Sequence, residues 1–511
     1  MKKILLALFL LTNLLAQAQD INVSLSKPFE IQGGDNYFKI GNSFYKMEID
    51  QSGLDFAVSS KLNKSTLAIT LYKYDNAMNE IRKNELEGGK KTFGPFLSKM
   101  VRFDNMLLLF NYKYYNSDTM RLFVSQIDTE TLATINTKEV FSYVQGNTRL
   151  RESLKYSSTD NLLISLSPDK SKIIVAHVNT EMISSCIINK NLDISEKTLS
   201  KTPDVRDFRG LTAFTDNGGN KYIGYRTGWS ETMQRGIFIQ TVSGKEVFTI
   251  LDPGTPMSAA TDISFCNSKD NTHINVYGTY TVIINSSGFD EGVFLTTIDT
   301  GTLKINNLHL FPYSDDFKKR MYDLDFGYKK KGVYYSTGIE FNLTEQENGA
   351  IELLGLCHKV DEGAFAYVVC GPIVSLLIHN GKMSSTVIPR LQPKSEASSD
   401  LVVQNKNNIV CIYTDYEKNL ALDMKGNKIE YDGPLDKKIF EDLVLVSAVI
   451  DTNNNVISRK KIGDKPDKGY YFLSYLMQLT DNSFILPIGK HKTTMSDIYA
   501  KFLQWSNLEI Q

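Results

Sequence analysis

Cysteine, histidine and proline are scarce in this chain of 511 residues, which contains 5, 6 and 13 of them respectively. Five cysteines without a C-x-x-C pair are too few for a disulfide-stabilised scaffold, so we expect most of them to be buried small apolar residues. Cys357 and Cys370 are the nearest pair in sequence and could form a disulfide in an oxidising compartment.

The histidines do not form a recognisable metal site. No two of them stand two or four residues apart, and His-Glu-x-x-His is absent, although ligands converging from distant loops would escape this test. Asp451–Asn455 places oxygen side chains at alternate positions, but Val456 and Ile462 occupy the positions where a calcium loop needs Gly and Glu. We expect a polar turn there, and we predict no metal and no cofactor.

Charge of one sign is also lacking. The chain has 57 basic and 58 acidic residues, a net charge of −1, and no long basic run, so we do not expect nucleic acid as a partner. No G-x-S-x-G elbow occurs, which disfavours a serine hydrolase of the usual strand-turn-helix type. Carboxylate pairs for glycoside cleavage are defined by distance in space, and spacing among so many acidic residues identifies none.

The N-terminus has the layout of a secretory signal peptide. Met1-Lys2-Lys3 is followed by the apolar stretch Ile4–Leu15 and by Ala16-Gln17-Ala18, which predicts cleavage after Ala18. No cysteine stands directly after the cleavage site, and no later segment is long and apolar enough to span a bilayer. We therefore predict a mature chain of residues 19–511 without a transmembrane segment, located in the periplasm, at the outer membrane or outside the cell.

Strand patterns dominate the mature chain. The sequence contains 27 Phe and 26 Tyr, and short alternating runs of β-branched and aromatic residues are separated by polar turns. A hairpin with an acidic or amide turn recurs, and we interpret it as the outer two strands of a four-stranded blade. Its copies are Leu71 to Ile81, Leu122 to Ile135, Ile237 to Gly244, Val293 to Leu303 and Val444 to Asn455.

A second recurrence indicates the size of the repeat. Tyr225-Arg-Thr-Gly-Trp229 matches Tyr335-Ser-Thr-Gly-Ile339, with a looser copy at Tyr277, and the successive steps are 52 and 58 residues. A period in the fifties is typical of propeller blades and predicts an all-β, single-domain β-propeller of roughly seven to eight four-stranded blades. Tyr413 lies 78 residues beyond Tyr335, which predicts an insertion or an irregular blade between them. The competing interpretation is two successive β-sandwiches.

The chain resembles the secreted β-propeller proteins of Gram-negative bacteria. Ser167-Pro-Asp-Lys-Ser-Lys-Ile-Ile-Val175 is similar to a segment common in their blades, although Lys170-Ser171 replaces the usual Gly. The resemblance covers most of residues 40 to 510, is one of architecture, and assigns no catalytic residues to this chain. We also expect Ile498–Trp505 to pair with a strand from residues 21–31 and so close the propeller.

One region is a candidate binding site. Alternating charges in residues 204–210 precede the Tyr225 strand, and equivalent Tyr residues on the first strand of each blade would line a central channel. Such aromatic and cationic groups suit a glycan or peptide, while the alternative is that the Tyr residues pack between blades. The predicted ligand-binding residues are Arg206, Arg209, Tyr225, Arg226, Trp229, Tyr277, Tyr335 and Glu340.

Three functions remain open from the sequence. The first is a non-catalytic propeller that binds an envelope protein or a polysaccharide, and the lack of a local catalytic signature favours it. The second is an extracellular polymer-acting enzyme, of the glycoside hydrolase or lyase type, with a site at the propeller mouth. The third is an assembly subunit associated with the outer membrane.

Overall fold

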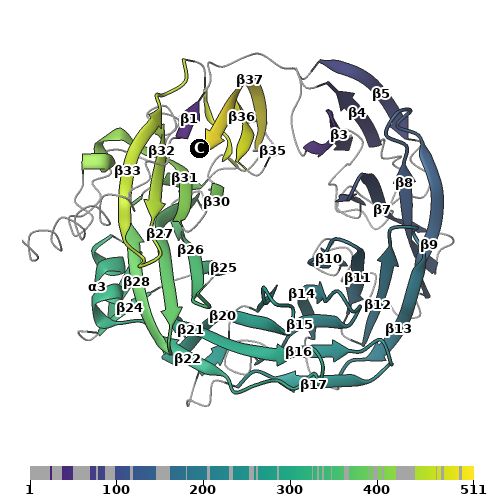
Figure 1. Cartoon of the computed structure of the whole chain (residues 1–511), viewed down its shortest axis with the longest axis horizontal. Coiled ribbons are helices and arrows are strands. Elements are labelled where there is room, and N and C mark those ends of the chain that lie inside the picture. The colour runs from purple at the N-terminus through teal and green to yellow at the C-terminus, as the bar shows by residue number, and fades with distance from the viewer. Residues whose placement is uncertain are drawn as a thin grey trace, which may run out of the picture. The chain divides into compact units, whose positions relative to one another are not determined.

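The protein consists almost entirely of antiparallel strands (Figure 1). The computed structural model describes residues 23–25, 37–49, 69–75, 79–86, 98–114, 119–144, 162–179, 181–203, 208–228, 234–252, 258–260, 263–284, 287–324, 326–330, 333–336, 339–346, 348–361, 367–390, 392–394, 401–405, 408–421, 443–467, 469–473, 477–480, 482–493 and 498–510. No helix in this part of the chain is long and apolar enough to cross a membrane.

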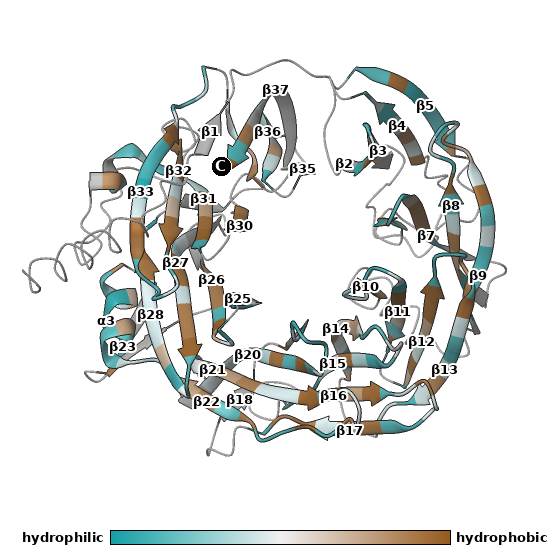
Figure 2. Cartoon of the chain, viewed as in Figure 1, coloured by the Kyte–Doolittle hydropathy of each residue, from teal (hydrophilic) through white to brown (hydrophobic). Residues whose placement is uncertain are grey.

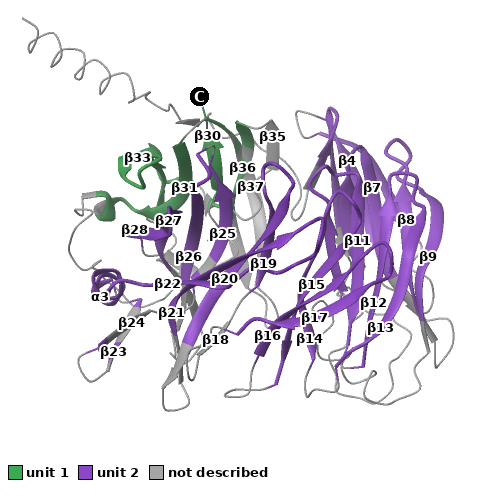
Figure 3. Ribbon diagram, turned by 60° about the horizontal axis from the view of Figure 1, so that its bottom comes forward, with its two compact units in different colours: residues 1–34, 392–422, 431–511 green, residues 35–391, 423–430 purple. Residues whose placement is uncertain are grey.

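The described strands form eight sheets, and the chain divides into two compact units, coloured separately in Figure 3. Unit 2 covers residues 35–391 and 423–430. Its first four sheets are β2 (Tyr37–Ile40), β3 (Ser43–Ile49), β4 (Ile69–Tyr74) and β5 (Glu80–Leu86); β6 (Ser98–Phe103), β7 (Met106–Tyr114), β8 (Thr119–Ile127) and β9 (Thr134–Val144); β10 (Leu162–Leu166), β11 (Lys172–Val178), β12 (Met182–Asn189) and β13 (Ile194–Lys201); and β14 (Arg209–Thr215), β15 (Lys221–Thr227), β16 (Gln234–Gln240) and β17 (Glu246–Ile250).

The other two sheets of unit 2 are larger. One contains β18 (Ser258–Ala260), β19 (Ser264–Asn267), β20 (His273–Ile284), β21 (Ser287–Asp299), β22 (His309–Pro312), β23 (Gly327–Lys330) and β24 (Val333–Ser336), with the helix α3 (Asp315–Asp323) between β22 and β23. The other is built on β25 (Ile339–Glu345), β26 (Ile351–Asp361), β27 (Tyr367–His379) and β28 (Lys382–Ile388).

Unit 1 covers residues 1–34, 392–422 and 431–511. Its elements are β1 (Val23–Leu25), β29 (Gln392–Lys394), β30 (Leu401–Asn405), β31 (Asn408–Tyr416), the 3₁₀ helix η3 (Glu417–Ala421), β32 (Leu443–Ile450), β33 (Val456–Gly463), β34 (Tyr470–Tyr471), β35 (Met477–Thr480), β36 (Ser483–Thr493) and β37 (Ile498–Ile510). One sheet is β30-β31-β32-β33, and the other has the order β1-β37-β36-β34 with β35 also on β36.

Burial differs systematically between the strands of a sheet. All eight residues of β32 are buried, whereas β13 alternates between exposed and partly buried positions over most of its length. Figure 2 shows the apolar residues concentrated on middle strands such as β27 and β32. A strand that is covered on both faces is apolar along its whole length, while a fourth strand with one solvated face alternates between apolar and polar residues.

Among the described residues, the large apolar clusters join two successive sheets of the same unit. Ile174 of β11 and Ile223 of β15 belong to one cluster, and Ile237 of β16 and Val276 of β20 belong to the next. Successive four-stranded meanders that bury their faces against one another are the architecture of a β-propeller. The predicted fold class, an all-β propeller of about seven to eight four-stranded blades, is therefore confirmed.

The recurring hairpins are the third and fourth strands of their sheets, as predicted. They correspond to β4–β5, β8–β9, β16–β17, β21–β22 and β32–β33. In two of them the turn has the same chemistry: Asp128 accepts hydrogen bonds from the backbone N–H and hydroxyl of Thr131, and Asp299 does so from Thr302. These bonds favour the ionised carboxylate and lower the pKa of Asp128.

An insertion follows β22 in the fifth sheet. Helix α3 begins after Ser314, whose hydroxyl accepts the Phe317 N–H at 3.2 Å, and it buries Phe317 and Met321. Beyond it, Phe326 packs on Gly371 of β27, which lacks a β-carbon at the contact. The insertion contains Tyr335, on β24. The insertion or irregular blade expected between Tyr335 and Tyr413 stays a prediction.

The two end strands share one sheet within unit 1. β1 pairs antiparallel with β37, with Val23 opposite Ile510 and Leu25 opposite Leu508. β1 therefore adds a strand to this sheet, next to β37. The division of the chain into a signal peptide and a single propeller domain stays a prediction.

A buried ion pair holds η3 against its sheet in unit 1. Asp415 is fully buried and lies 3.1 Å from Nη2 of Arg459, whose side chain is 7% exposed. Arg459 also donates from Nε to the Tyr413 hydroxyl at 2.9 Å and from Nη1 to the Asn419 carbonyl at 3.0 Å. Ala448, the cross-strand neighbour of Arg459, is small enough for the long side chain to cross β32.

Candidate functional site

Three arginines stand side by side at one end of sheet β14–β17. In the strand register Arg209 of β14 is opposite Arg226 of β15, and Arg226 is opposite Arg235 of β16. Directly opposed residues share one face of a sheet and lie about 4.5–5.5 Å apart at their Cα atoms. We call this set the arginine row; it places three positive charges next to one another on adjacent strands.

The three arginines of the row differ in how far they are exposed and in whether they have an interaction partner. Arg235 is buried, whereas Arg209 and Arg226 are partly exposed. Arg209 and Arg235 each take part in an interaction, but the Arg226 guanidinium has no hydrogen-bond or ion-pair partner among the described residues. Like charges at directly opposed positions destabilise a sheet, so an anion beside Arg226 would relieve the repulsion.

Tyr225 lies on the opposite face of the sheet from Arg226. Its ring covers Gly236, where a β-carbon would clash with it, and stacks on Phe208 with 4.6 Å between ring centroids. Burial raises the pKa of its hydroxyl to about 12. The structure therefore packs Tyr225 between sheets and does not bring it together with Arg209 and Arg226, two of the three arginines that the sequence grouped with it.

Tyr277, which the sequence matched to Tyr225, does not take the equivalent place. Tyr277 is buried toward the sheet of β25–β28, where its hydroxyl accepts the Leu343 N–H at 3.2 Å. Tyr280 takes the place equivalent to Tyr225, because its ring covers Gly292 of the neighbouring strand. Tyr225 and Tyr277 also lie on the second strands of their sheets, not on the first as the sequence-based hypothesis assumed.

The remaining predicted residues add little to the site as described. The backbone positions of Tyr335 and Glu340 lie on β24 and β25, and their side chains lie outside what the structure describes. Arg206 and Trp229 lie outside the described residues altogether. Arg235 is the member that sequence reasoning missed, because only the β15–β16 register reveals that it joins Arg226. Ligand binding by the predicted set stays a prediction.

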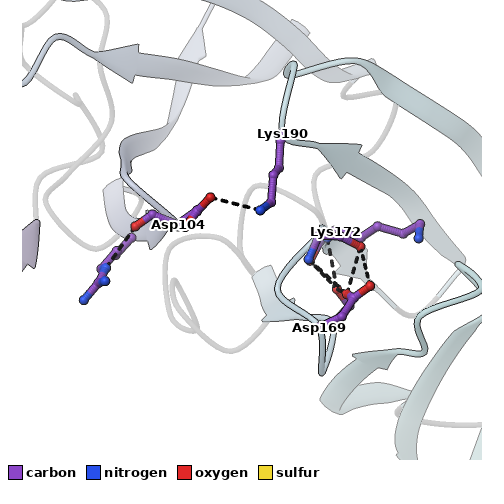
Figure 4. Close-up of polar contacts among 7 residues, drawn as sticks. Asp104, Asp169, Lys172 and Lys190 are labelled. Carbon is purple, nitrogen blue, oxygen red and sulfur yellow. Dashed lines mark hydrogen bonds and ion pairs between the residues drawn. The ribbon is translucent and has the colours of Figure 1, made fainter. Parts of the chain in front are cut away.

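The second, third and fourth sheets have tight turns at the end opposite to the arginine row. Polar and charged groups of these turns contact one another from sheet to sheet. Lys190 lies 2.9 Å from Asp104, joining the second and third sheets (Figure 4). Asp169 donates its backbone N–H to the Asn217 side chain at 3.1 Å, and Lys172 donates to the Asn217 carbonyl at 2.5 Å, joining the third and fourth sheets. These turn contacts connect neighbouring sheets, so their charged groups have partners within the protein, whereas Arg226 of the arginine row has none among the described residues.

Lys221 is the centre of a buried polar cluster between the third and fourth sheets. Its ammonium is fully buried and donates to the Gln240 side chain at 2.8 Å, the Glu196 carbonyl at 2.6 Å and the Thr198 hydroxyl at 3.1 Å. Burial, partly offset by the charge of Glu196, lowers the pKa of Lys221 to about 8. Lys221 therefore loses its proton at a lower pH than an ordinary lysine does.

We expect Lys221 to make stability rise with pH in mildly alkaline solution. Above pH 8 the native chain loses this proton, while the unfolded chain keeps it up to its ordinary pKa of 10.5, so the unfolded state binds more protons in this window. The free energy of unfolding of the wild type should increase relative to Lys221→Met between pH 8 and 10, measured by urea unfolding. Lys245→Met, at an exposed position, is the control, and the difference in free energy of unfolding between it and the wild type should stay constant. If the difference between the wild type and Lys221→Met also stays constant from pH 8 to 10, the assignment is wrong.

The nucleophilic and metal-binding groups of the described residues form no further cluster. No group of three or more His, Cys, Asp or Glu side chains within them could hold a metal ion. Cys186, Cys357 and Cys411 are buried, and burial raises the pKa of the Cys186 thiol to about 12. His177 is buried, which lowers its pKa to about 4. The Cys186 thiol and the His177 imidazole are therefore uncharged at neutral pH.

Comparison with known proteins yields structural likeness only. No protein-family model and no curated protein sequence matches the chain. Among solved structures, the Dos1 propeller is 10% identical with a TM-score of 0.43 and covers 95% of both chains. An ulvan lyase of a polysaccharide lyase family is 11% identical with a TM-score of 0.41, covering 81% of this chain and 92% of its own. The WD40 domain of SCAP from fission yeast is 9% identical with a TM-score of 0.36, covering 96% and 98%. Such low scores carry no argument about function.

Proposed function

We propose that this protein is an exported, non-catalytic β-propeller that binds an acidic polysaccharide of the cell envelope through the arginine row. The observation that supports the proposal is Arg226, a partly exposed guanidinium between two further arginines. A polymer with a carboxylate or sulfate on each repeating unit presents anions in a row, and each anion can accept paired hydrogen bonds from a guanidinium. Export follows from the predicted signal peptide of residues 1–18.

Binding to immobilised polygalacturonate tests the proposal. We expect Arg226→Ala to weaken binding by about ten- to a hundredfold, because a hydrogen-bonded charge contact contributes about 1.5–3 kcal/mol. Binding should also weaken with added salt, and neutral dextran should not be retained. Arg82→Ala is the matched control, since Arg82 is an exposed arginine on β5 outside the row.

Three results would contradict this function. Equal losses of affinity for Arg226→Ala and Arg82→Ala would mean that binding depends only on the net charge of the protein. Binding to polygalacturonate that Arg226→Ala leaves unchanged would place the site elsewhere. Retention of an acidic protein but of no acidic polysaccharide would replace the ligand class. The sequence-based alternatives, a polymer-acting enzyme and an outer-membrane-associated assembly subunit, stay predictions, tested by sugar-release assays and by cell fractionation.

A further inference from the structure

Lys99 is a second exposed cation near the start of a first strand. It is the second residue of β6, and a turn at Asp104 follows at the other end of that strand. Arg209 is the first residue of β14, and the turn at Asp216 follows it in the same way. Lys99 and the arginine row therefore lie at the same end of the second and fourth sheets, which pack on the two faces of the third.

The Lys99 side chain faces the third sheet. Lys99 is directly opposite Phe110 in the register, so the two side chains share one face of the second sheet. Phe110 belongs to the apolar cluster that packs this face on the third sheet, and Leu162, the first residue of β10, packs against the same cluster. Lys99 thus points toward the sheet that separates it from the arginine row.

The Lys99 ammonium has no counter-ion in the described part of the protein. Its side chain is exposed, and no described residue forms a hydrogen bond or an ion pair with it. The protein around it still removes part of its hydration, and this burial lowers the pKa of Lys99. An anion stabilises a partly desolvated cation more than a fully hydrated one, because the local dielectric constant is lower.

The first strands of the first four sheets carry charge of one sign. They contain no Asp or Glu, and their charged residues are Lys39, Lys99, Arg102 and Arg209. The whole chain, by contrast, has 57 basic and 58 acidic residues. First strands line the central channel of a propeller. The positive charge of the arginine row therefore continues along these strands toward Lys99.

We propose that Lys99 is a second anion-binding residue for the acidic polysaccharide, and that the bound chain extends from the arginine row past β10 to Lys99. This contact rests on the proposed function, since it needs a ligand that is held at the arginine row. Packed sheets lie about 10 Å apart, so two positions separated by one sheet are roughly 20 Å apart. All five residues of β10 are partly exposed and uncharged, so the sugar units in between meet a neutral surface. Only a chain of several acidic units reaches both cations.

Titration calorimetry of the mature protein with galacturonate oligomers of increasing length tests this contact. The affinity of the wild type should rise about tenfold at the length that reaches Lys99, because a charge-assisted contact is then added. Lys99→Met keeps the aliphatic part of the side chain and should lack this rise, while its affinity for shorter oligomers stays unchanged. Arg226→Ala should weaken binding at every length. Lys382→Met, the same change at an exposed position on β28, is the control and should bind like the wild type.

Two results would exclude the second contact and leave the proposed function intact. A rise with length that persists in Lys99→Met would mean that the chain runs elsewhere. Equal weakening of all lengths by Lys99→Met would mean that Lys99 acts only through the local charge. If no oligomer binds the wild type, or if Arg226→Ala binds all of them like the wild type, the proposed function fails together with this contact. Circular dichroism of each variant establishes that it is folded.

Discussion

Replacing Asp415 with alanine should lower the free energy of unfolding by about 3–5 kcal/mol, the cost of leaving a buried charge without its partner. Asp415 is fully buried and accepts hydrogen bonds from the Arg459 guanidinium at 3.1 Å, the Asn419 amide at 2.7 Å and the Tyr416 N–H at 2.8 Å. Without the carboxylate, Arg459 keeps two acceptors but loses its counter-charge, and its side chain is only 7% exposed. Urea unfolding measures the loss.

Two further variants separate burial of the charge from loss of packing. Asp415→Leu combined with Arg459→Met should recover most of the stability, because an apolar pair of similar volume carries no desolvation cost. Glu417→Ala removes the exposed partner of Lys461 and should cost less than about 1 kcal/mol. If Asp415→Ala is no more destabilising than Glu417→Ala, the pair does not hold η3 in the way described.

Phe326→Ala should be about as damaging, with an expected loss of about 3–5 kcal/mol. The ring is 1% exposed and packs on the bare backbone of Gly371, so its removal leaves a cavity between the insertion and β27. Gly371 also offers its carbonyl to the buried Arg390 at 2.9 Å, which fixes the backbone and limits how far the site can collapse. Urea unfolding again measures the loss.

A double-mutant cycle tests this contact directly. Gly371→Ala in the wild type pushes a methyl group into the ring and should cost about 1–3 kcal/mol. In the Phe326→Ala background the same methyl group enters vacated space, and its cost should fall close to zero. Phe110, on a different sheet, is the control: Phe110→Ala and Gly371→Ala should add within about 0.5 kcal/mol. Additive losses for Phe326 and Gly371 would contradict the packing.

The hairpins were predictable from the sequence because their signal is local. In an Asp-Thr-x-Thr-Leu turn, the aspartate side chain accepts a backbone N–H of the turn. The leucine that ends the turn has a φ of 60° at both Leu132 and Leu303. The alternating residues around it then determine the strands. A repeat of such units predicts a propeller without any long-range information, which is why the fold class was accessible.

The tyrosine alignment failed because the face of a strand depends on register. Tyr277 and Tyr280 are three residues apart and therefore face opposite neighbours, and the looser sequence match selected Tyr277. Tyr335 matched the motif but lies in the inserted hairpin. Sequence similarity over four residues cannot distinguish these cases, since the partner strand decides which residue meets a glycine.

The arginine row was only partly accessible for the same reason. Arg209 and Arg226 belong to the charged segment and the Tyr225 strand in which the sequence analysis placed the site, but their alignment depends on a bulge between Gly210 and Thr212. Arg235 follows a loop and joins the row through the β15–β16 register. Charge composition locates such residues approximately, whereas pairing decides whether they stand next to one another.

The aromatic rings that cover glycines in three successive sheets have a consequence for how the protein can change. Tyr225 covers Gly236, Tyr280 covers Gly292, and the Phe341 ring covers Gly355. Neither member of a pair can be replaced alone without a clash or a cavity. In relatives of this protein, each glycine and its ring should therefore be inherited together, and a designed blade should copy the two positions as one unit.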